Sequence, residues 1–167
     1  MHRLIRWALL ACSLILAGCI GGGQAAGSFR QANAPIWSAA ALDQARLAGD
    51  WRQVAGLAGA PGGCRQGGLH IAPATNGLRL SGSLCLNGRV ERVRALAREA
   101  GPGRLSVGGE EWWVLWVDSG YRTLVLGTPS GRFGVILDRG TIPQDRLEAA
   151  REILDFNGYD TGALQSF

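Results

Sequence analysis

The stretch "GGLHIAPATNGLRLSGSLCL", residues 67–86, decides the fold class of this chain. It contains two short apolar runs, and between them lies Asn76-Gly77, a dipeptide typical of β-hairpin turns. In the second run leucines alternate with arginine and serine, so one face of the segment is apolar and the other is polar. A period of two residues indicates a strand that is buried on one face only.

Further runs of the same kind precede and follow this hairpin. The segment 89–99 is rich in residues that favour helices, but it follows the hairpin dipeptide Asn87-Gly88, which favours a strand. Eight close antiparallel strands are typical of a sandwich or a closed up-and-down barrel. The run "WWVLWV", residues 112–117, is apolar on both faces and favours closure, because it would be an aggregation hazard at an open edge. The strands are expected at 49–56, 67–73, 77–86, 89–99, 101–109, 111–118, 121–129 and 131–140.

The segment "TIPQDRLEAAREILDFNGYD", residues 141–160, has a different pattern. Pro143 stands near its start and Asn157-Gly158 near its end, which is the usual order of helix start and stop signals. Apolar residues recur at steps of three and four and form one stripe: Leu147, Ala150, Ile153 and Leu154. We therefore expect one amphipathic helix that packs on the outside of the β-structure.

The N-terminus has the features of an export signal. A basic start, "MHRLIRW", is followed by an apolar run that is too short to span a bilayer comfortably, and then by "LAGC" at residues 16–19. Small residues before a cysteine resemble the lipobox of bacterial lipoproteins. The resemblance implies that residues 1–18 are removed as a signal peptide and that Cys19 carries a diacylglycerol and an acyl chain such as palmitate. The alternative is a plain secretory signal or a short anchor in which Cys19 is incidental.

The remaining chain divides into two parts. Residues 19–35 are small and polar and are expected to form a flexible tether, and residues 36–167 form the folded domain. Cys64 and Cys85 are an even pair in an exported chain, which favours a disulfide; the alternative is that Cys64 is a free nucleophile. All 17 basic residues are arginine, the formal net charge is only +4, and no basic cluster suggests nucleic-acid binding.

Three motifs of the expected barrel resemble those of lipocalins. "GDW", residues 49–51, matches the G-x-W signature of the first lipocalin strand. Residues 118–129 resemble the stretch before the seventh strand, with Tyr121 at the tyrosine of its T-D-Y motif, and Arg139 ends the eighth strand as the third-motif arginine does. The tail through "GYD", residues 158–160, looks like that of bacterial lipocalins of the outer-membrane lipoprotein type.

The resemblance implies an all-β fold, an eight-stranded antiparallel up-and-down lipocalin barrel with one C-terminal helix packed outside. In this family the motif residues are structural, so Gly49, Trp51, Tyr121 and Arg139 are expected to close one end of the barrel. The guanidinium of Arg139 is expected to lie across the indole of Trp51, a cation–π contact.

The same resemblance implies which side chains line the barrel. An apolar, aromatic lining of this kind suits a fatty acid, a lysophospholipid or a similar amphiphile. The alternative is that these side chains fill the core, and the opposite face of 112–117, with Trp113, Leu115 and Val117, is equally apolar. The expected ligand-binding residues are Leu78, Leu80, Leu84, Trp112, Val114, Trp116, Thr123, Val125, Val135 and Leu137.

Three classes of function remain open. The first is a membrane-anchored protein that binds a small hydrophobic or amphiphilic ligand for lipid storage or transport in the cell envelope. The second is a filled barrel that serves as a structural or interaction module, and the third is a lipocalin-like enzyme. The exported part has one histidine, His70, and shows no metal-ligand spacing and no nucleophile–histidine–acid set, so no catalytic residue, metal or cofactor is expected.

Location and partners follow from the same features. Ile20, rather than aspartate, follows Cys19, and by the sorting rule of enteric bacteria this favours the outer membrane, with the domain facing the periplasm. Four arginines crowd one strand, where they meet a ligand or lipid headgroups at the barrel mouth or else form a solvated outer face: Arg89, Arg92, Arg94 and Arg98. The expected partners are a lipid and the membrane, and the oligomeric state is left open.

Overall fold

The computed structural model describes residues 27–60, 63–64 and 66–167. The expected signal peptide, Cys19 and the first part of the expected tether, up to residue 26, lie outside the described residues. Within these ranges no helix has both the length and the apolar character needed to cross a membrane.

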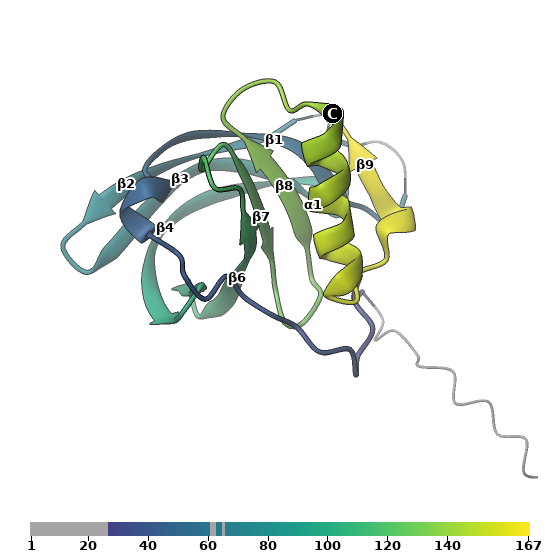
Figure 1. Ribbon diagram of the computed structural model, residues 1–167, viewed down its shortest axis with the longest axis horizontal. Helices are drawn as coiled ribbons and strands as arrows, with labels where there is room; N and C mark the ends of the chain where they lie inside the picture. Colours follow the sequence, from purple (N-terminus) through teal and green to yellow (C-terminus); the bar gives the residue numbers. More distant parts are fainter. Residues whose placement is uncertain (1–26, 61–62, 65) are drawn as a thin grey trace, which may run out of the picture.

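The described strands form one antiparallel sheet that closes on itself, as Figure 1 shows. Strands β1 to β8 are neighbours in sequence order, and β1 pairs with both β8 and β2. The closed eight-stranded barrel that the sequence predicts is therefore confirmed, including a strand at 89–99. The elements are η1 (Gln44–Leu47), β1 (Gly49–Leu57), β2 (Gly68–Ala74), β3 (Gly77–Leu86), β4 (Arg89–Gly101), β5 (Arg104–Val107), β6 (Glu110–Val117), β7 (Thr123–Gly127), β8 (Gly134–Asp138), α1 (Gln144–Phe156), η2 (Thr161–Ala163) and β9 (Leu164–Ser166).

One edge of strand β1 pairs with two different strands. Its first half, Gly49 to Arg52, pairs with β2, and its second half, Ala55 to Leu57, pairs with β9 outside the barrel. The register with β8 shifts between Gln53 and Ala55, and such a bulge bends a strand. The three-residue β9 was not expected from the sequence, because so short a segment has no periodicity.

The predicted helix is confirmed as α1, with Pro143 as its N-cap residue. At its C-terminus the amide of Tyr159 donates to the carbonyl of Leu154 and that of Gly158 to Asp155. Gly158 has a φ of +79°. These features form a Schellman motif, which ends the helix and turns the chain towards η2.

Two apolar layers hold the domain together. The first fills the barrel and includes Trp51, Leu80 and Trp112. The second lies between the barrel wall and α1, where Leu154 packs with Val125. Figure 1 shows α1 lying beside β7, β8 and β9 on the outside of the barrel.

The packed chain begins before the expected boundary at residue 36. Phe29 and Arg30 are buried, and the amide of Phe29 donates to the carbonyl of Gly131 in the turn between β7 and β8. The side chain of Arg30 donates to the carbonyl of Asn157 at 2.8 Å. The small, polar residues around this point gave no signal of such docking, because it depends on two distant turns of the chain.

Candidate functional site

One end of the barrel is closed by Trp51 and Arg139, as the motifs predict. The central guanidinium carbon of Arg139 lies 4.1 Å from the centroid of the Trp51 indole, which confirms the expected contact. The indole NH of Trp51 donates to the carbonyl of Leu47 at 2.8 Å, and this bond ties η1 across the same end. We call this the closed end of the barrel.

Gly49 and Tyr121 complete the closed end. Gly49 has a φ of +116°, and a Cβ atom there would lie 2.5 Å from Nη1 of Arg139. A side chain at residue 49 is thus disfavoured by the backbone conformation, and it would displace the end of the Arg139 side chain. The hydroxyl of Tyr121 accepts a hydrogen bond from the amide of Asp43 at 2.8 Å, and Arg46 lies over the ring of Tyr121. All four motif residues therefore have structural roles.

Most of the side chains expected to line the barrel do face its interior. They belong to the interior cluster, together with Leu69, Ile71, Leu124, Leu126 and Phe133, which the sequence did not single out. The inward direction is confirmed for these seven, while their role in ligand binding stays a prediction: Leu78, Leu80, Leu84, Trp112, Val114, Val135 and Leu137.

Three of the expected lining residues lie on the opposite face, so their predicted direction is wrong. The register between β6 and β7 shifts between Val114 and Trp116, which reverses the alternation after Val114. Trp116 is paired with Val125, and both pack in the outer layer near α1. Thr123 follows the same alternation, and its hydroxyl donates to Asp138 at 2.7 Å.

The interior of the barrel is densely filled. Several of its side chains expose none of their surface: Leu84, Val114, Leu124, Phe133 and Leu137. A cavity that admits water would leave part of its lining accessible, so these side chains occupy most of the space themselves. Trp112 and Phe133 meet edge to face with their centroids 5.0 Å apart, and they account for much of this filling.

Gln53 is the buried polar side chain at the point where β1 leaves β2. Its amide oxygen accepts from the backbone NH of Cys85 at 2.7 Å, and its amide nitrogen donates to the Cys85 carbonyl at 2.9 Å. Strand β2 pairs with β3 only as far as Ser83, so the Gln53 amide takes the place of a strand beside Cys85. Both polar groups are thereby satisfied, and the interior stays free of unpaired polar atoms at this position.

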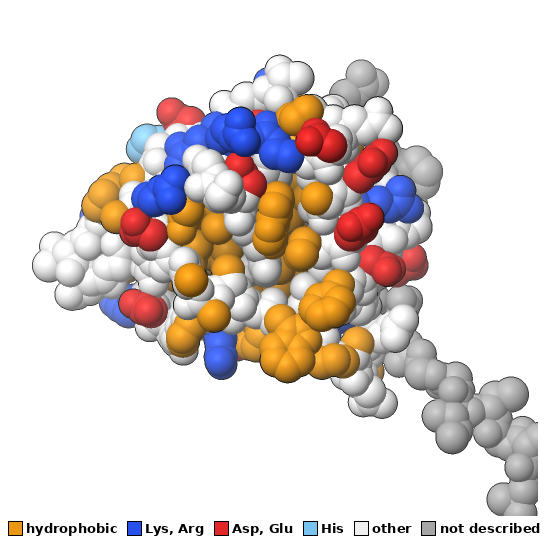
Figure 2. Space-filling model, in the orientation of Figure 1, with side chains coloured by type: hydrophobic (Ala, Val, Ile, Leu, Met, Phe, Trp, Pro, Cys, Tyr) orange, Lys and Arg blue, Asp and Glu red, His pale blue; other side chains and the backbone are white. Residues whose placement is uncertain are grey.

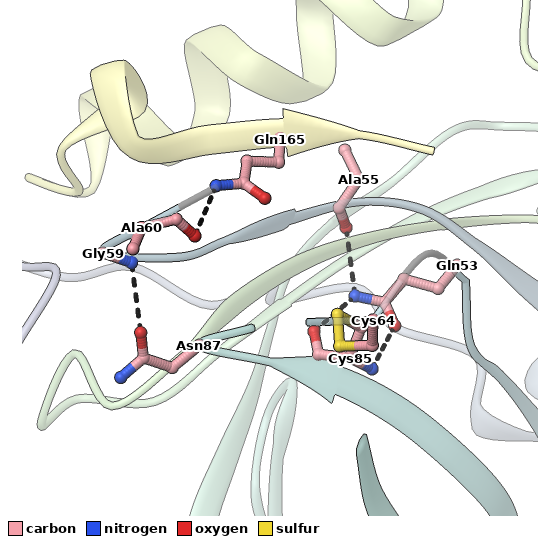
Figure 3. The surroundings of a disulfide bond; sticks show 8 residues. All are labelled: Gln53, Ala55, Gly59, Ala60, Cys64, Cys85, Asn87 and Gln165. Carbon is pink, nitrogen blue, oxygen red and sulfur yellow. Dashed lines mark hydrogen bonds between the residues drawn. A yellow bond between two sulfur atoms is a disulfide. The ribbon is translucent and has the colours of Figure 1, made fainter. Parts of the chain in front are cut away.

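The predicted disulfide between Cys64 and Cys85 is confirmed, with a Cα–Cα distance of 5.7 Å. Figure 3 shows it next to Gln53, where the segment after β1 crosses β3. Nearby, the amide of Gly59 donates to the side chain of Asn87, and Gln165 of β9 donates to the carbonyl of Ala60. Cys64 is therefore held in a structural bridge, which removes it as a free thiol nucleophile.

The opposite end of the barrel, which we call the mouth, is formed by the turns that follow β1, β3, β5 and β7. Arg132, just before β8, donates two hydrogen bonds to Glu110 of β6, at 2.7 and 2.6 Å, and contacts Glu91 of β4 at 3.0 Å. These three side chains span the mouth, and we call them the mouth bridge. Trp112 donates to Glu110 at 3.1 Å, and the Arg132 guanidinium lies 5.2 Å from the Phe133 ring centroid.

The charges of the mouth bridge stabilise one another. The hydrogen bonds from Arg132 lower the pKa of Glu110 below its ordinary value, against the opposing effect of burial. Hydrogen bonds to Glu110 and Glu91 in turn raise the pKa of Arg132. No local pattern indicates this bridge, because its members are distant in the chain and stand among many other charged residues.

A second polar cluster lies under the start of α1, outside the barrel. Burial raises the pKa of Asp118, but hydrogen bonds from the backbone amides of Thr123 and Arg122 outweigh it, so the pKa lies below its ordinary value. Arg146 of α1 lies 3.5 Å from Asp138 and 3.8 Å from Asp118. This cluster fastens α1 to the barrel wall and is remote from the interior.

The remaining sequence candidates are at the surface. Arg92 and Arg94 pair opposite Ser83 and Ser81 and alternate with the buried Val93, so they lie on the outer face, and Arg98 follows the same alternation. Arg89 is exposed beside the turn at the mouth. His70 is exposed and lies 2.7 Å from Asp50. No group of three or more metal-ligating side chains occurs in the part of the chain that the structure describes.

No family model and no curated protein matches the chain. The siderocalin Ex-FABP matches with a TM-score of 0.56 and 13% identity, over 73% of this chain and 93% of its own. Lobster apocrustacyanin A1 matches with a TM-score of 0.55 and 11% identity, over 80% of this chain and 88% of its own. Identities this low bear on the fold alone, and the chain therefore has the lipocalin fold.

Proposed function

We propose that this protein binds one small hydrophobic or amphiphilic ligand inside the barrel, with entry at the mouth. The main support for ligand binding is the chemistry of the inner face of the barrel. Its side chains are apolar or aromatic, and the amide of Gln53 is fully paired with Cys85. An interior of this kind offers a hydrocarbon chain a low-polarity environment, and the charged mouth bridge is suited to a polar headgroup.

Binding requires the filled interior to open. Trp112 and Phe133 lie directly below the mouth bridge and are the side chains that a ligand would displace. The ligand class is a fatty acid, a lysophospholipid or a similar amphiphile. The siderocalin Ex-FABP is described as acting through dual ligand specificities, and a likeness in fold supports ligand binding here only as an analogy.

We also propose where the protein acts. Cys19 is its lipid-attachment residue and holds it at the outer membrane. There the protein stores or transports lipid in the cell envelope. We propose no catalytic activity, because Cys64 is bridged to Cys85 and the described residues hold no metal-ligating cluster. A Cys19→Ser variant should be absent from the membrane fraction and from the detergent phase, whereas the wild-type protein should be found in both.

A filled barrel that acts as a structural or interaction module is the second candidate. It is favoured by the complete burial of interior side chains such as Leu84, Val114 and Phe133. Organic extraction of the purified protein, followed by mass spectrometry, separates the two candidates. A stoichiometric amphiphile supports ligand binding. Its absence, together with no response to added fatty acid, would support the filled barrel.

A further inference from the structure

Two large aromatic side chains stand exposed where the N-terminal segment meets the end of α1. Trp37 exposes 59% of its surface and Phe156 exposes 68%. The backbone amide of Trp37 donates to the side chain of Asn157 at 2.7 Å, which fixes Trp37 beside the last residues of α1. Figure 2 shows hydrophobic side chains gathered around this lower end of α1. We call Trp37 and Phe156 the aromatic patch.

The end of α1 that carries Phe156 lies at the mouth end of the barrel, and Trp37 lies beside it, where the chain leaves the mouth and runs along the barrel wall to a bond between Ser38 and Pro102. Strand β8 runs from the mouth to the closed end, and α1 returns in the opposite direction, so its C-terminus is at the mouth end. Arg30 links this terminus to the β7–β8 turn, because its side chain donates to Asn157 and to Pro129. That turn also carries Arg132 of the mouth bridge.

The chain enters the domain at the same place. The amide of Phe29 donates to Gly131 at 2.8 Å, and the carbonyl of Phe29 accepts from Asp160 at 2.8 Å. Ser28 bonds to the carbonyl of Ser130 at 2.9 Å. The N-terminal segment is thus fastened at the mouth, and whatever holds residue 19 holds the domain from this end.

The length of chain before this point limits its distance from the membrane. An extended chain spans at most about 3.6 Å per residue, so Cys19 lies within roughly 29 Å of Gly27. A domain of this size has a diameter of roughly 37 Å, from a radius of gyration near 14 Å. The mouth end therefore stays close to any bilayer that holds Cys19, while the side chains on its surface determine which face makes contact.

We propose that the aromatic patch inserts into the interfacial region of the bilayer that holds Cys19, so that the barrel mouth faces lipid. Indole and phenyl side chains favour this region. The contact is apolar rather than electrostatic, because the exposed Asp155 and Asp160 flank the patch and disfavour anionic headgroups. The inference rests on the lipid anchor in the proposed function, and it gives the ligand a direct route between bilayer and barrel.

The test uses the lipidated full-length protein in phosphatidylcholine vesicles that carry bromine on the acyl chains near the headgroup. Brominated lipid should quench part of the tryptophan emission of the wild type, and Trp37→Phe should abolish that part. The matched control Trp113→Phe, a partly buried tryptophan of the barrel wall, should remain quenched. Phe156→Ser should reduce the quenching of Trp37. A salt concentration of about 0.5 M, at which surface charges are strongly screened, should leave the quenching unchanged.

The possible results distinguish the orientation of the domain on the bilayer from its lipid anchoring. If the protein sediments with the vesicles but Trp37→Phe is quenched as strongly as the wild type, the orientation is wrong and the anchor stands. If the protein stays out of the vesicle pellet, the anchor is wrong and the orientation is overturned with it.

Discussion

Arg139 and Trp51 lie in contact, with the guanidinium carbon 4.1 Å from the indole centroid, and they join the end of β8 to the beginning of β1. Arg139 also donates to the carbonyls of Tyr121, Arg46 and Ala48 at 2.8 to 2.9 Å. One side chain thus connects β1, the β6–β7 turn and η1 at the closed end. The contact therefore supports barrel closure.

Replacing Trp51 with alanine should lower the free energy of unfolding by about 3–5 kcal/mol, because a buried indole is removed and a cavity is left. Trp37→Ala is the control, since Trp37 is exposed and its loss should change the stability by less than about 0.5 kcal/mol. Urea unfolding of the two variants gives the comparison. Equal losses would contradict the structural role of Trp51.

Gly49→Ala should be more destabilising than the same change at Gly108. Both residues have positive φ, but a Cβ atom at Gly49 meets Arg139 at 2.5 Å, whereas at Gly108 it meets nothing within 4 Å. The expected cost is about 1–3 kcal/mol at Gly49 and about 1 kcal/mol at Gly108. Thermal unfolding of the pair checks the order, and a reversed order would show that Arg139 moves freely.

Removing the disulfide should destabilise the protein without unfolding it. The bridge joins Cys64 to Cys85, 21 positions apart, and a loop of this size contributes about 3 kcal/mol through the unfolded state. The double variant Cys64→Ala, Cys85→Ala should therefore unfold at lower urea concentration. An unchanged midpoint would mean that the hydrogen bonds of Gln53 alone hold this part of β3.

The mouth bridge should make stability depend on acid pH. The pKa of Glu110 is lower in the folded protein than in the unfolded chain, so its contribution is present above the unfolded value and is lost as the pH falls through the folded value. Stability should thus decline below about pH 4.5. Glu110→Gln should flatten this decline below about pH 4.5.

Glu111→Gln is the matched control for that experiment, because Glu111 bonds to Trp113 on the outer surface and takes no part in the mouth bridge. Urea unfolding at several pH values gives both curves. If Glu110→Gln keeps the acid decline of the wild type, the decline arises elsewhere, with Asp118 the next carboxylate to replace.

The sequence was sufficient for the barrel, α1, the disulfide and the closed end. These features depend on alternation, on hairpin and capping residues and on an even pair of cysteines, which are all local patterns. The predicted direction of side chains was wrong for two reasons. The bulge after Val114 turned Trp116 outward. In β7 it is Leu124 and Leu126 that face the interior, so Val125 and Thr123 lie on the outer face.

The mouth and its surroundings could not be predicted in the same way. Arg132 contacts Glu91 and Glu110 only because three separate turns meet at one end of the barrel. Phe29 and Arg30 likewise acquire partners at Gly131 and Asn157 through the closed topology. Such contacts need the register of the strands, which composition and periodicity do not specify.

A ligand that occupies the barrel interior would lie beside Trp112. The most direct test is fatty-acid titration of two matched variants, Trp112→Phe inside the barrel and Trp113→Phe on its wall, with tryptophan emission as the readout. Fatty acid should change the emission of the wild type and of Trp113→Phe, and Trp112→Phe should lose most of this response. An equal response in both variants, or none in the wild type, would contradict ligand binding inside the barrel.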